Sequence, residues 1–186
     1  MKRIGAAALV LMILAGCTGK RSEMDKIMQL RATLLACEAC SFDASITADY
    51  GDAVHTFQLR CEGTNDGDMN FQVLQPESIS GITGRFAGEE GLLTFDKAAL
   101  AFPLLADGQV TPVSGPWILL KTMLGGYLTA CGKEGELLHL TIDDSYEEDA
   151  LQLEIWLNGE NLPVQAETIY DDRRIVTMEI ENFQIR

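Results

Sequence analysis

Strict alternation of apolar and polar residues marks the segment from residue 42 to residue 50. The apolar positions are Phe42, Ala44, Ile46, Ala48 and Tyr50, and a polar residue stands between each pair. Successive side chains of a strand point to opposite faces, so a period of two predicts a strand with one face in a core and the other in water. A chain with this segment is expected to build an antiparallel sheet.

The next residues can return the chain as the second strand of a hairpin. Gly51-Asp52 is suited to a two-residue turn, and the register that it sets places Ile46 opposite Phe57. Apolar residues then meet across the whole inner face, except that His55 falls at the open end of the hairpin. The hairpin is therefore predicted with a defined register.

Further alternating runs extend the pattern to about nine strands. They lie at residues 69–73, 79–86, 91–95, 138–142 and 151–157. The last hairpin is predicted to pair 164–170 with 176–180 across a three-residue loop, 171–173. Strands joined by short turns in this way predict one strongly curved antiparallel sheet, an open half-barrel.

Two segments have the features of helices. Residues 22–40 carry apolar side chains at a period of 3.6, which predicts a first helix with one apolar face. In mid-chain, Pro116 follows Ser114-Gly115, and Gly125-Gly126 ends an apolar run, as expected for a helix start and stop. This second helix is apolar nearly all round and should be covered on several sides. The fold class is therefore a β-dominated α+β domain whose curved sheet wraps around two helices.

The N-terminus has the pattern of an export signal. Residues 1–3 are basic and residues 4–16 form an apolar run, which is too short to span a membrane and has the length of a signal-peptide core. The run ends in Leu14-Ala15-Gly16-Cys17, which resembles the bacterial lipobox and implies that the thiol of Cys17 receives a diacylglycerol. We expect a signal peptide over 1–16, a lipid-anchored spacer over 17–21 and a folded domain over 22–186, on the extracytoplasmic face of the cell membrane.

Charge and cysteine content narrow the expected chemistry. The chain has 14 Lys+Arg against 28 Asp+Glu, a net charge of -14, which argues against nucleic acid as a partner. Cys37, Cys40, Cys61 and Cys131 remain after the lipobox cysteine. An even set of thiols outside the cytoplasm favours disulfides over zinc or a thioredoxin-like redox pair. We predict Cys40–Cys61 from the hairpin register and, by elimination, Cys37–Cys131.

Signals for catalysis are few. No Gly-x-Ser-x-Gly turn exposes a nucleophile, and His139 alternates outward from its strand. Residues 143–149 hold five carboxylates in a pattern unlike an EF-hand, which favours a solvated loop over a weak calcium site. We expect no catalytic residue, no metal and no cofactor.

The apolar mid-chain helix and the first hairpin supply the candidate ligand-binding residues. These side chains either form ordinary core or close over a space left for acyl chains. They are Trp117, Leu120, Met123 and Leu124 of the helix, with Ile46 and Phe57 of the hairpin.

The whole pattern resembles the LolA-type lipoprotein carriers, and in particular the lipid-anchored branch in spore-forming bacteria that includes the germination lipoprotein GerS. The resemblance is carried by the lipobox, the N-terminal helix, the strand meander, the Pro-Trp helix, and Leu-x-Ile-Trp-Leu-Asn at 153–158 followed by Leu-Pro-Val at 162–164. It implies an incomplete barrel lidded by helices, with an apolar cavity that in the carriers receives acyl chains. Some anchored members act by binding another protein.

Two departures from the carriers are visible. An anchor at Cys17 excludes free shuttling between membranes. The carriers also hold their closed lid with an arginine inside the barrel, whereas Arg60 falls on the wet face in the predicted register, so that role is not assigned to it or to Arg85.

Two functions are expected from these features. The first is a membrane-anchored, non-enzymatic module that binds lipid or lipoprotein acyl chains in the concave face of the sheet. The alternative is a structural or regulatory envelope protein, with a GerS-like role in sporulation or germination, whose cavity is filled by its own side chains. That protein would bind another envelope protein through the sheet edge or the acidic loop.

Overall fold

The computed structural model describes residues 23–186 except residues 52, 89, 96, 97, 104, 107, 108, 148 and 149. The predicted signal peptide over 1–16, the predicted lipidation at Cys17 and the spacer over 17–21 lie outside the described residues. Within them, no helix combines the length and the apolar character needed to cross a bilayer.

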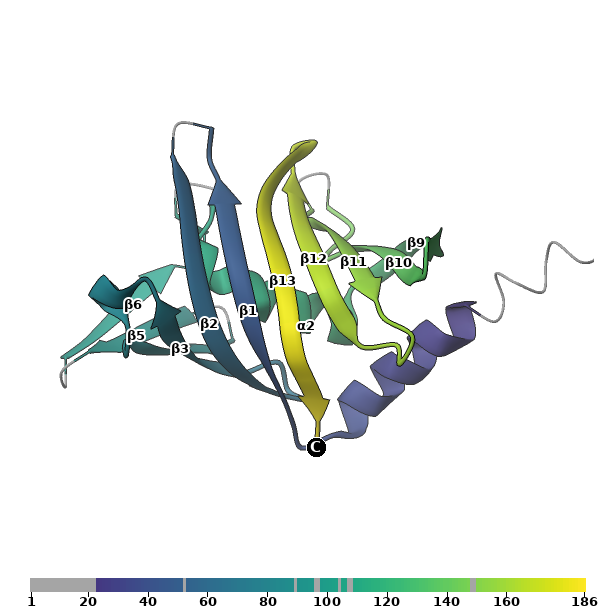
Figure 1. Cartoon of the computed structure of the whole chain (residues 1–186), viewed down its shortest axis with the longest axis horizontal. Coiled ribbons are helices and arrows are strands. Elements are labelled where there is room, and N and C mark those ends of the chain that lie inside the picture. The colour runs from purple at the N-terminus through teal and green to yellow at the C-terminus, as the bar shows by residue number, and fades with distance from the viewer. Residues whose placement is uncertain are drawn as a thin grey trace, which may run out of the picture.

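Eleven of the described strands form one large, strongly curved antiparallel sheet, and two short strands pair separately (Figure 1). Eleven strands follow the order β6-β5-β4-β3-β2-β1-β13-β12-β11-β10-β9, and β6 and β9 are its edges. The bounds are β1 Ala39–Asp49, β2 Val54–Thr64, β3 Met69–Gln75, β4 Thr83–Ala87, β5 Glu90–Phe95, β6 Ala98–Pro103, β9 Tyr127–Glu134, β10 Leu137–Asp143, β11 Gln152–Leu157, β12 Pro163–Tyr170 and β13 Arg173–Ile185. The predicted fold class is confirmed, although the strand number is higher than expected.

The sheet consists of two meanders that meet at its centre. The chain starts at β1 and steps outward to the edge strand β6. It then reaches the opposite edge at β9 and steps inward to β13, which pairs with β1. The connection from one edge to the other must cross the sheet. It contains β7 Leu105–Ala106, β8 Gln109–Val110, the 3-10 turn η2 Pro112–Ser114 and the helix α2 Gly115–Gly125. This topology places α2 across the concave face.

The predicted register of the first hairpin is confirmed. Ile46 pairs with Phe57 and Phe42 pairs with Cys61. The apolar side chains of β1 at Phe42, Ala44, Ile46 and Ala48 are buried, as their alternation predicts.

The last hairpin differs from the prediction by one loop residue. Tyr170 pairs with Arg173, so only Asp171 and Asp172 form the turn, and both have positive φ. Two left-handed residues are the geometry of a type I′ turn, whose twist matches that of the flanking strands. The three-residue loop was therefore wrong.

Two other element bounds were also wrong, and two strands of the large sheet were missed. The first helix occupies residues 23–36 of the described chain, and Ala39 already starts β1. The expected strand at 79–86 begins only at Thr83, because the 3-10 turn η1 Glu77–Ile79 precedes it. The missed strands are β6 and β9, and the sequence of β9 does not alternate regularly.

Candidate ligand-binding site on the concave face

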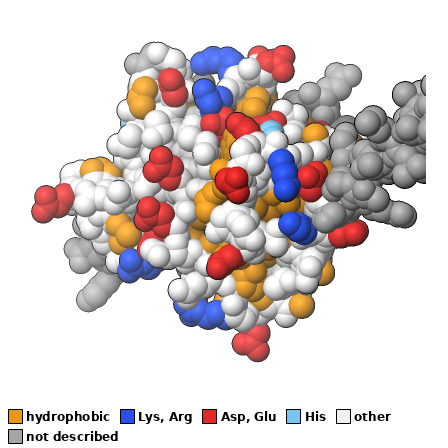
Figure 2. Space-filling view, turned by 45° about the vertical axis from the view of Figure 1, so that its right-hand side comes forward, with side chains coloured by type: hydrophobic (Ala, Val, Ile, Leu, Met, Phe, Trp, Pro, Cys, Tyr) orange, Lys and Arg blue, Asp and Glu red, His pale blue; other side chains and the backbone are white. Residues whose placement is uncertain are grey.

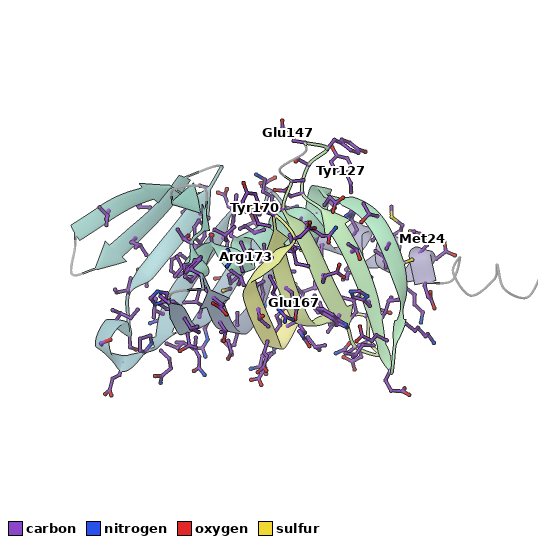
Figure 3. The ribbon with its side chains drawn as sticks, turned by 90° about the horizontal axis from the view of Figure 1, so that it is seen from above. Met24, Tyr127, Glu147, Glu167, Tyr170 and Arg173 are labelled. Carbon is purple, nitrogen blue, oxygen red and sulfur yellow. The ribbon has the colours of Figure 1, made fainter. Side chains whose placement is uncertain are left out.

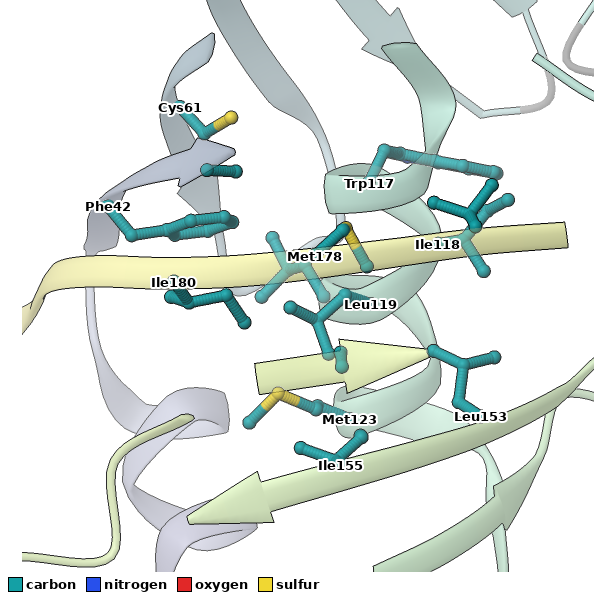
Figure 4. Packing of buried hydrophobic residues seen from close by; sticks show 14 of the residues in the cluster. Phe42, Cys61, Trp117, Ile118, Leu119, Met123, Leu153, Ile155, Met178 and Ile180 are labelled. Carbon is teal, nitrogen blue, oxygen red and sulfur yellow. The ribbon is translucent and has the colours of Figure 1, made fainter. Parts of the chain in front are cut away.

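Helix α2 is held against the concave face by apolar side chains on several of its sides. Its buried residues include Trp117, Ile118, Leu119, Leu120 and Met123. Figure 4 shows the helix facing Met178 and Ile180 of β13 and Leu153 and Ile155 of β11. The all-round apolar character expected from the sequence is therefore explained by burial between the two meanders.

Glycines let the helix approach the sheet closely. A Cβ atom added at Gly63 of β2 would lie 2.2 Å from Cδ2 of Leu120. At Gly115, the first residue of α2, an added Cβ would lie 3.1 Å from Sδ of Met178 and 3.3 Å from Cγ1 of Val176. A Cβ atom at Gly63 would therefore force Leu120 to move, and one at Gly115 would fit only if the side chains of Met178 and Val176 shifted slightly.

The candidate residues lie in or against one hydrophobic cluster, and most of them are core. Trp117, Leu120, Met123 and Ile46 are buried in one hydrophobic cluster. Leu124 and Phe57 are half-buried and pack against the same cluster. His55, predicted to point inward at the open end of the first hairpin, lies instead near the turn of that hairpin, opposite Ala48, and is exposed beside Phe57.

Polar contacts fix both ends of α2. The indole Nε1 of Trp117 donates to the carbonyl of Gly67 in the β2–β3 turn at 2.9 Å. At the other end, Nε of Arg31 in the first helix donates to the carbonyl of Met123 at 2.8 Å. The ammonium of Lys121 lies 4.8 Å from the centre of the Trp117 ring, a cation–π distance. The two hydrogen bonds join α2 to the β2–β3 turn and to the first helix, and the Lys121–Trp117 contact lies within α2.

The apolar surface continues beyond α2 toward the β6 edge. The rings of Phe71 and Phe86 are stacked with centroids 5.2 Å apart, and Phe86 lies 5.7 Å from Trp117. Leu93 pairs with buried Gly84 on one side and with Leu100 on the other, which places all three on the concave face. Leu93 is half-buried, whereas Leu100 is 65% exposed. This end of the concave face therefore presents an apolar side chain to solvent.

The convex face is polar. Figure 2 shows acidic and basic side chains interspersed over the visible side of the molecule, with smaller hydrophobic patches between them. Arg60 and Arg85, which line a pocket of about 480 Å³ between β2 and β5, are each paired with a carboxylate, at 3.0 Å to Asp43 and 2.6 Å to Asp68. The prediction that Arg60 faces outward is confirmed.

A side-chain cluster that sequence reasoning missed lies on β10 and β11. His139 stacks on Trp156 with ring centroids 4.7 Å apart, and its Nε2 contacts a carboxylate oxygen of Glu154. The indole of Trp156 donates to Glu134 at 2.8 Å. His139 does alternate outward as expected, but the pairing of β10 with β11 gives it partners that only the register reveals.

Neither predicted disulfide is formed. All four cysteines of the described chain are free thiols: Cys37, Cys40, Cys61 and Cys131. Cys40 is opposite Gly63 while Cys61 is opposite Phe42, so the two cysteines are diagonal neighbours. Diagonal positions on a sheet are about 7–8 Å apart, whereas a disulfide joins Cβ atoms about 3.5–4.5 Å apart. Cys37 donates its thiol hydrogen to the carbonyl of Leu34 at 3.0 Å, which requires a free thiol.

Burial also makes two of these thiols poor nucleophiles. It raises the pKa of Cys40 to about 11, and the pKa of fully buried Cys61 is also raised, with smaller contributions from neighbouring thiols and carboxylates. Both side chains are therefore protonated at neutral pH and behave as small apolar core residues.

The acidic loop is accompanied by exposed aromatic residues. Tyr146 is 83% exposed, and its ring lies against Tyr127 of β9 with centroids 3.5 Å apart. Figure 3 shows Tyr127 and Glu147 protruding close together at the top edge of the view. Among the described residues, no three His, Cys, Asp or Glu side chains are placed to share a metal ion.

Comparisons of this chain with known proteins find matches among solved structures. No protein-family model and no curated protein matches the chain. The solved structures include a LolA superfamily protein from Nitrosomonas europaea, with a TM-score of 0.45 and 10% identity over 89% of this chain and 93% of that one. They also include the lipoprotein LppX from Mycobacterium tuberculosis, with a TM-score of 0.42 and 10% identity over 88% of this chain and 95% of that one.

A third similar structure is the complex of the CwlD amidase with the GerS lipoprotein from Clostridioides difficile. The TM-score is 0.42, with 12% identity over 86% of this chain and 93% of that one. The LolA superfamily and GerS are thus among the proteins of similar architecture, as the sequence pattern suggested. At these values the likeness concerns the arrangement of helices and strands alone.

Proposed function

We propose that this protein is a non-enzymatic lipoprotein, anchored through Cys17 to the extracytoplasmic face of the cell membrane, that binds an acyl chain on the concave face of its sheet. The observation that supports this is that Leu100, on the same face as buried Phe86 and half-buried Leu93, is 65% exposed. The acyl chain would lie at the β4–β6 end, beside Phe86 and Trp117, because α2 occupies the centre.

The driving force for binding is apolar burial. Each methylene group moved out of water contributes about 0.8 kcal/mol, so several methylenes lying along Leu93 and Leu100 are enough for measurable affinity. Leu100 also continues a row of buried and half-buried apolar side chains, and contiguous exposed apolar surface marks a binding site where an isolated surface leucine does not.

Leu100→Asp is expected to weaken binding of a fluorescent fatty acid by tenfold or more, roughly the loss of one buried leucine contact. The side chain is mostly exposed in the free protein, so the variant should fold normally. Binding is measured by fluorescence titration. Leu92→Asp is the matched control, because Leu92 is 42% exposed on the neighbouring strand but points to the convex face with Arg85. Equal affinity of the two variants would place the acyl chain elsewhere.

A second candidate function is binding of another envelope protein. The close packing of Leu120 on Gly63 favours it, because the centre of the concave face is filled by the chain's own side chains. The Tyr127–Tyr146 pair beside the carboxylates of the loop offers aromatic contact area and negative charge, which would suit a partner with a basic surface.

Tyr146→Ser combined with Asp144→Asn is expected to lower recovery of such a partner several-fold when the lipoprotein is purified from solubilised membranes. The reason is loss of both the aromatic contact and part of the charge complementarity. Recovery is compared with that of Glu160→Gln, an exposed carboxylate in another turn. Unchanged recovery would remove the loop from the interface.

A further inference from the structure

The first helix has two apolar faces, and only one of them is covered. Ile27, Leu30 and Leu34 are buried in the core cluster. A second set, here called the Met24 stripe, is exposed: Met24 at 38%, Met28 at 50% and Leu35 at 51%.

The three side chains of the stripe are aligned. With about 100° of turn per residue, Met28 is about 40° and Leu35 about 20° from Met24 around the helix axis. The stripe therefore runs along one side of the helix for about three turns. Polar residues such as Gln29 occupy a different side and are also exposed.

The helix is held in place by contacts that leave the stripe free. Arg31 falls on the same side of the helix as the stripe, about 20° from Met24 and between Met28 and Leu35, but its Nε donates to the carbonyl of Met123. The side-chain amide of Asn65 donates to the carbonyl of Leu35 at 3.4 Å. The buried face thus fixes the rotation of the helix, and the stripe points away from the core.

The short segment between Cys17 and the first helix limits how far the stripe can lie from the membrane. Five residues lie between the predicted lipidation site at Cys17 and Glu23, and the six Cα–Cα steps from Cys17 to Glu23 span about 21 Å at most when extended. Lys20 and Arg21 lie within that short segment and are attracted to lipid phosphates. An anchored chain therefore keeps the start of this helix close to the bilayer surface. In Figure 3, Met24 lies at the N-terminal end of the helix.

We infer that the Met24 stripe rests on the phospholipid bilayer that holds the anchor, with its side chains at the boundary between headgroups and acyl chains. This inference depends on the proposed anchoring through Cys17. The stripe adds an apolar contact to the acyl anchor, and a rigid helix held at two places sets the orientation of the whole domain. The acidic domain then keeps one orientation relative to the membrane and does not rotate freely about a flexible linker.

Depth-dependent fluorescence quenching tests the contact. The full-length lipoprotein is reconstituted into vesicles of phosphatidylethanolamine and phosphatidylglycerol, with or without bromine on the acyl chains. Met28→Trp is compared with Gln29→Trp, which places the same indole on the polar side of the same helix turn. Trp117 and Trp156 are present in both variants and contribute equally. Brominated lipid is expected to lower the added fluorescence of Met28→Trp about twofold and to leave that of Gln29→Trp nearly unchanged.

Vesicle flotation separates the two levels of the proposal. Protein that floats while both added indoles are quenched equally, or not at all, overturns the stripe contact but leaves the anchor intact. Absence of quenching together with cross-linking of Met28→Cys to a second protein would show that a protein covers the stripe, which also overturns it. Protein that does not float overturns the anchor and the stripe contact together.

Discussion

Leu120→Ala is expected to lower the free energy of unfolding by about 3–5 kcal/mol, near the upper end for buried leucines. Leu120 is 2% exposed and packs on Gly63, where the sheet has no side chain to shift into the space left behind. The loss is a large share of the stability of an ordinary domain. It is measured by urea unfolding in detergent micelles, followed by circular dichroism.

The control for Leu120→Ala is Leu35→Ala, which removes the same atoms from a side chain that is half exposed. Its cost is expected to stay within about 0.5 kcal/mol. Similar costs for the two variants would mean that α2 does not fill the concave face. The same geometry implies that Leu120→Asp unfolds the domain, because a carboxylate would be buried without a partner. It therefore cannot serve as a clean test of ligand binding, whereas Leu100→Asp can.

Gly126→Ala is expected to destabilise the domain by about 2–3 kcal/mol through overpacking. An added Cβ would lie 2.7 Å from the carbonyl oxygen of Thr122 and 2.8 Å from that of Asp143 in β10. Both are backbone atoms and cannot rotate away as the end of a side chain could. The φ of Gly126 is -69°, so the cost comes from these contacts and not from backbone conformation.

The neighbouring glycine is a matched control. Gly125 is exposed at the end of α2, and an added Cβ would meet no atom within 4 Å. Gly125→Ala should stabilise the domain by up to about 1 kcal/mol, because alanine loses less backbone entropy in a helix. The measurement is the midpoint of thermal unfolding of Gly126→Ala and of Gly125→Ala, each compared with that of the parent protein. Equal midpoints would show that the end of α2 does not abut β10.

Features set by neighbours in the chain could be predicted from sequence. The alternation from Phe42 to Tyr50 and the turn at residue 51 set the register of the first hairpin, including the pairing of Ile46 with Phe57. Pro116 and Gly125 mark the start and end of α2. In each case the signal lies within a few residues and acts through φ/ψ preference or side-chain period.

Features that depend on distant residues could not be predicted in this way. Nothing in the alternation of β1 shows that its second neighbour is β13, more than a hundred residues away, or that the connecting helix must therefore cross the concave face. The centre of the concave face is likewise filled because Leu120 packs on Gly63. These two residues come together only because α2 crosses that face.

The cysteines and the candidate site show the same division. The sequence by itself determined which side chains are apolar and which face of each strand they share, because side-chain direction alternates along any strand. Tertiary structure alone decided that Cys40 and Cys61 stay thiols, that Trp117 and Leu120 are core, and that Leu100 is left exposed. The reason is that the separation of two side chains and their exposure to solvent depend on how the strands and the helix pack. A periodic pattern in the sequence does not specify that packing.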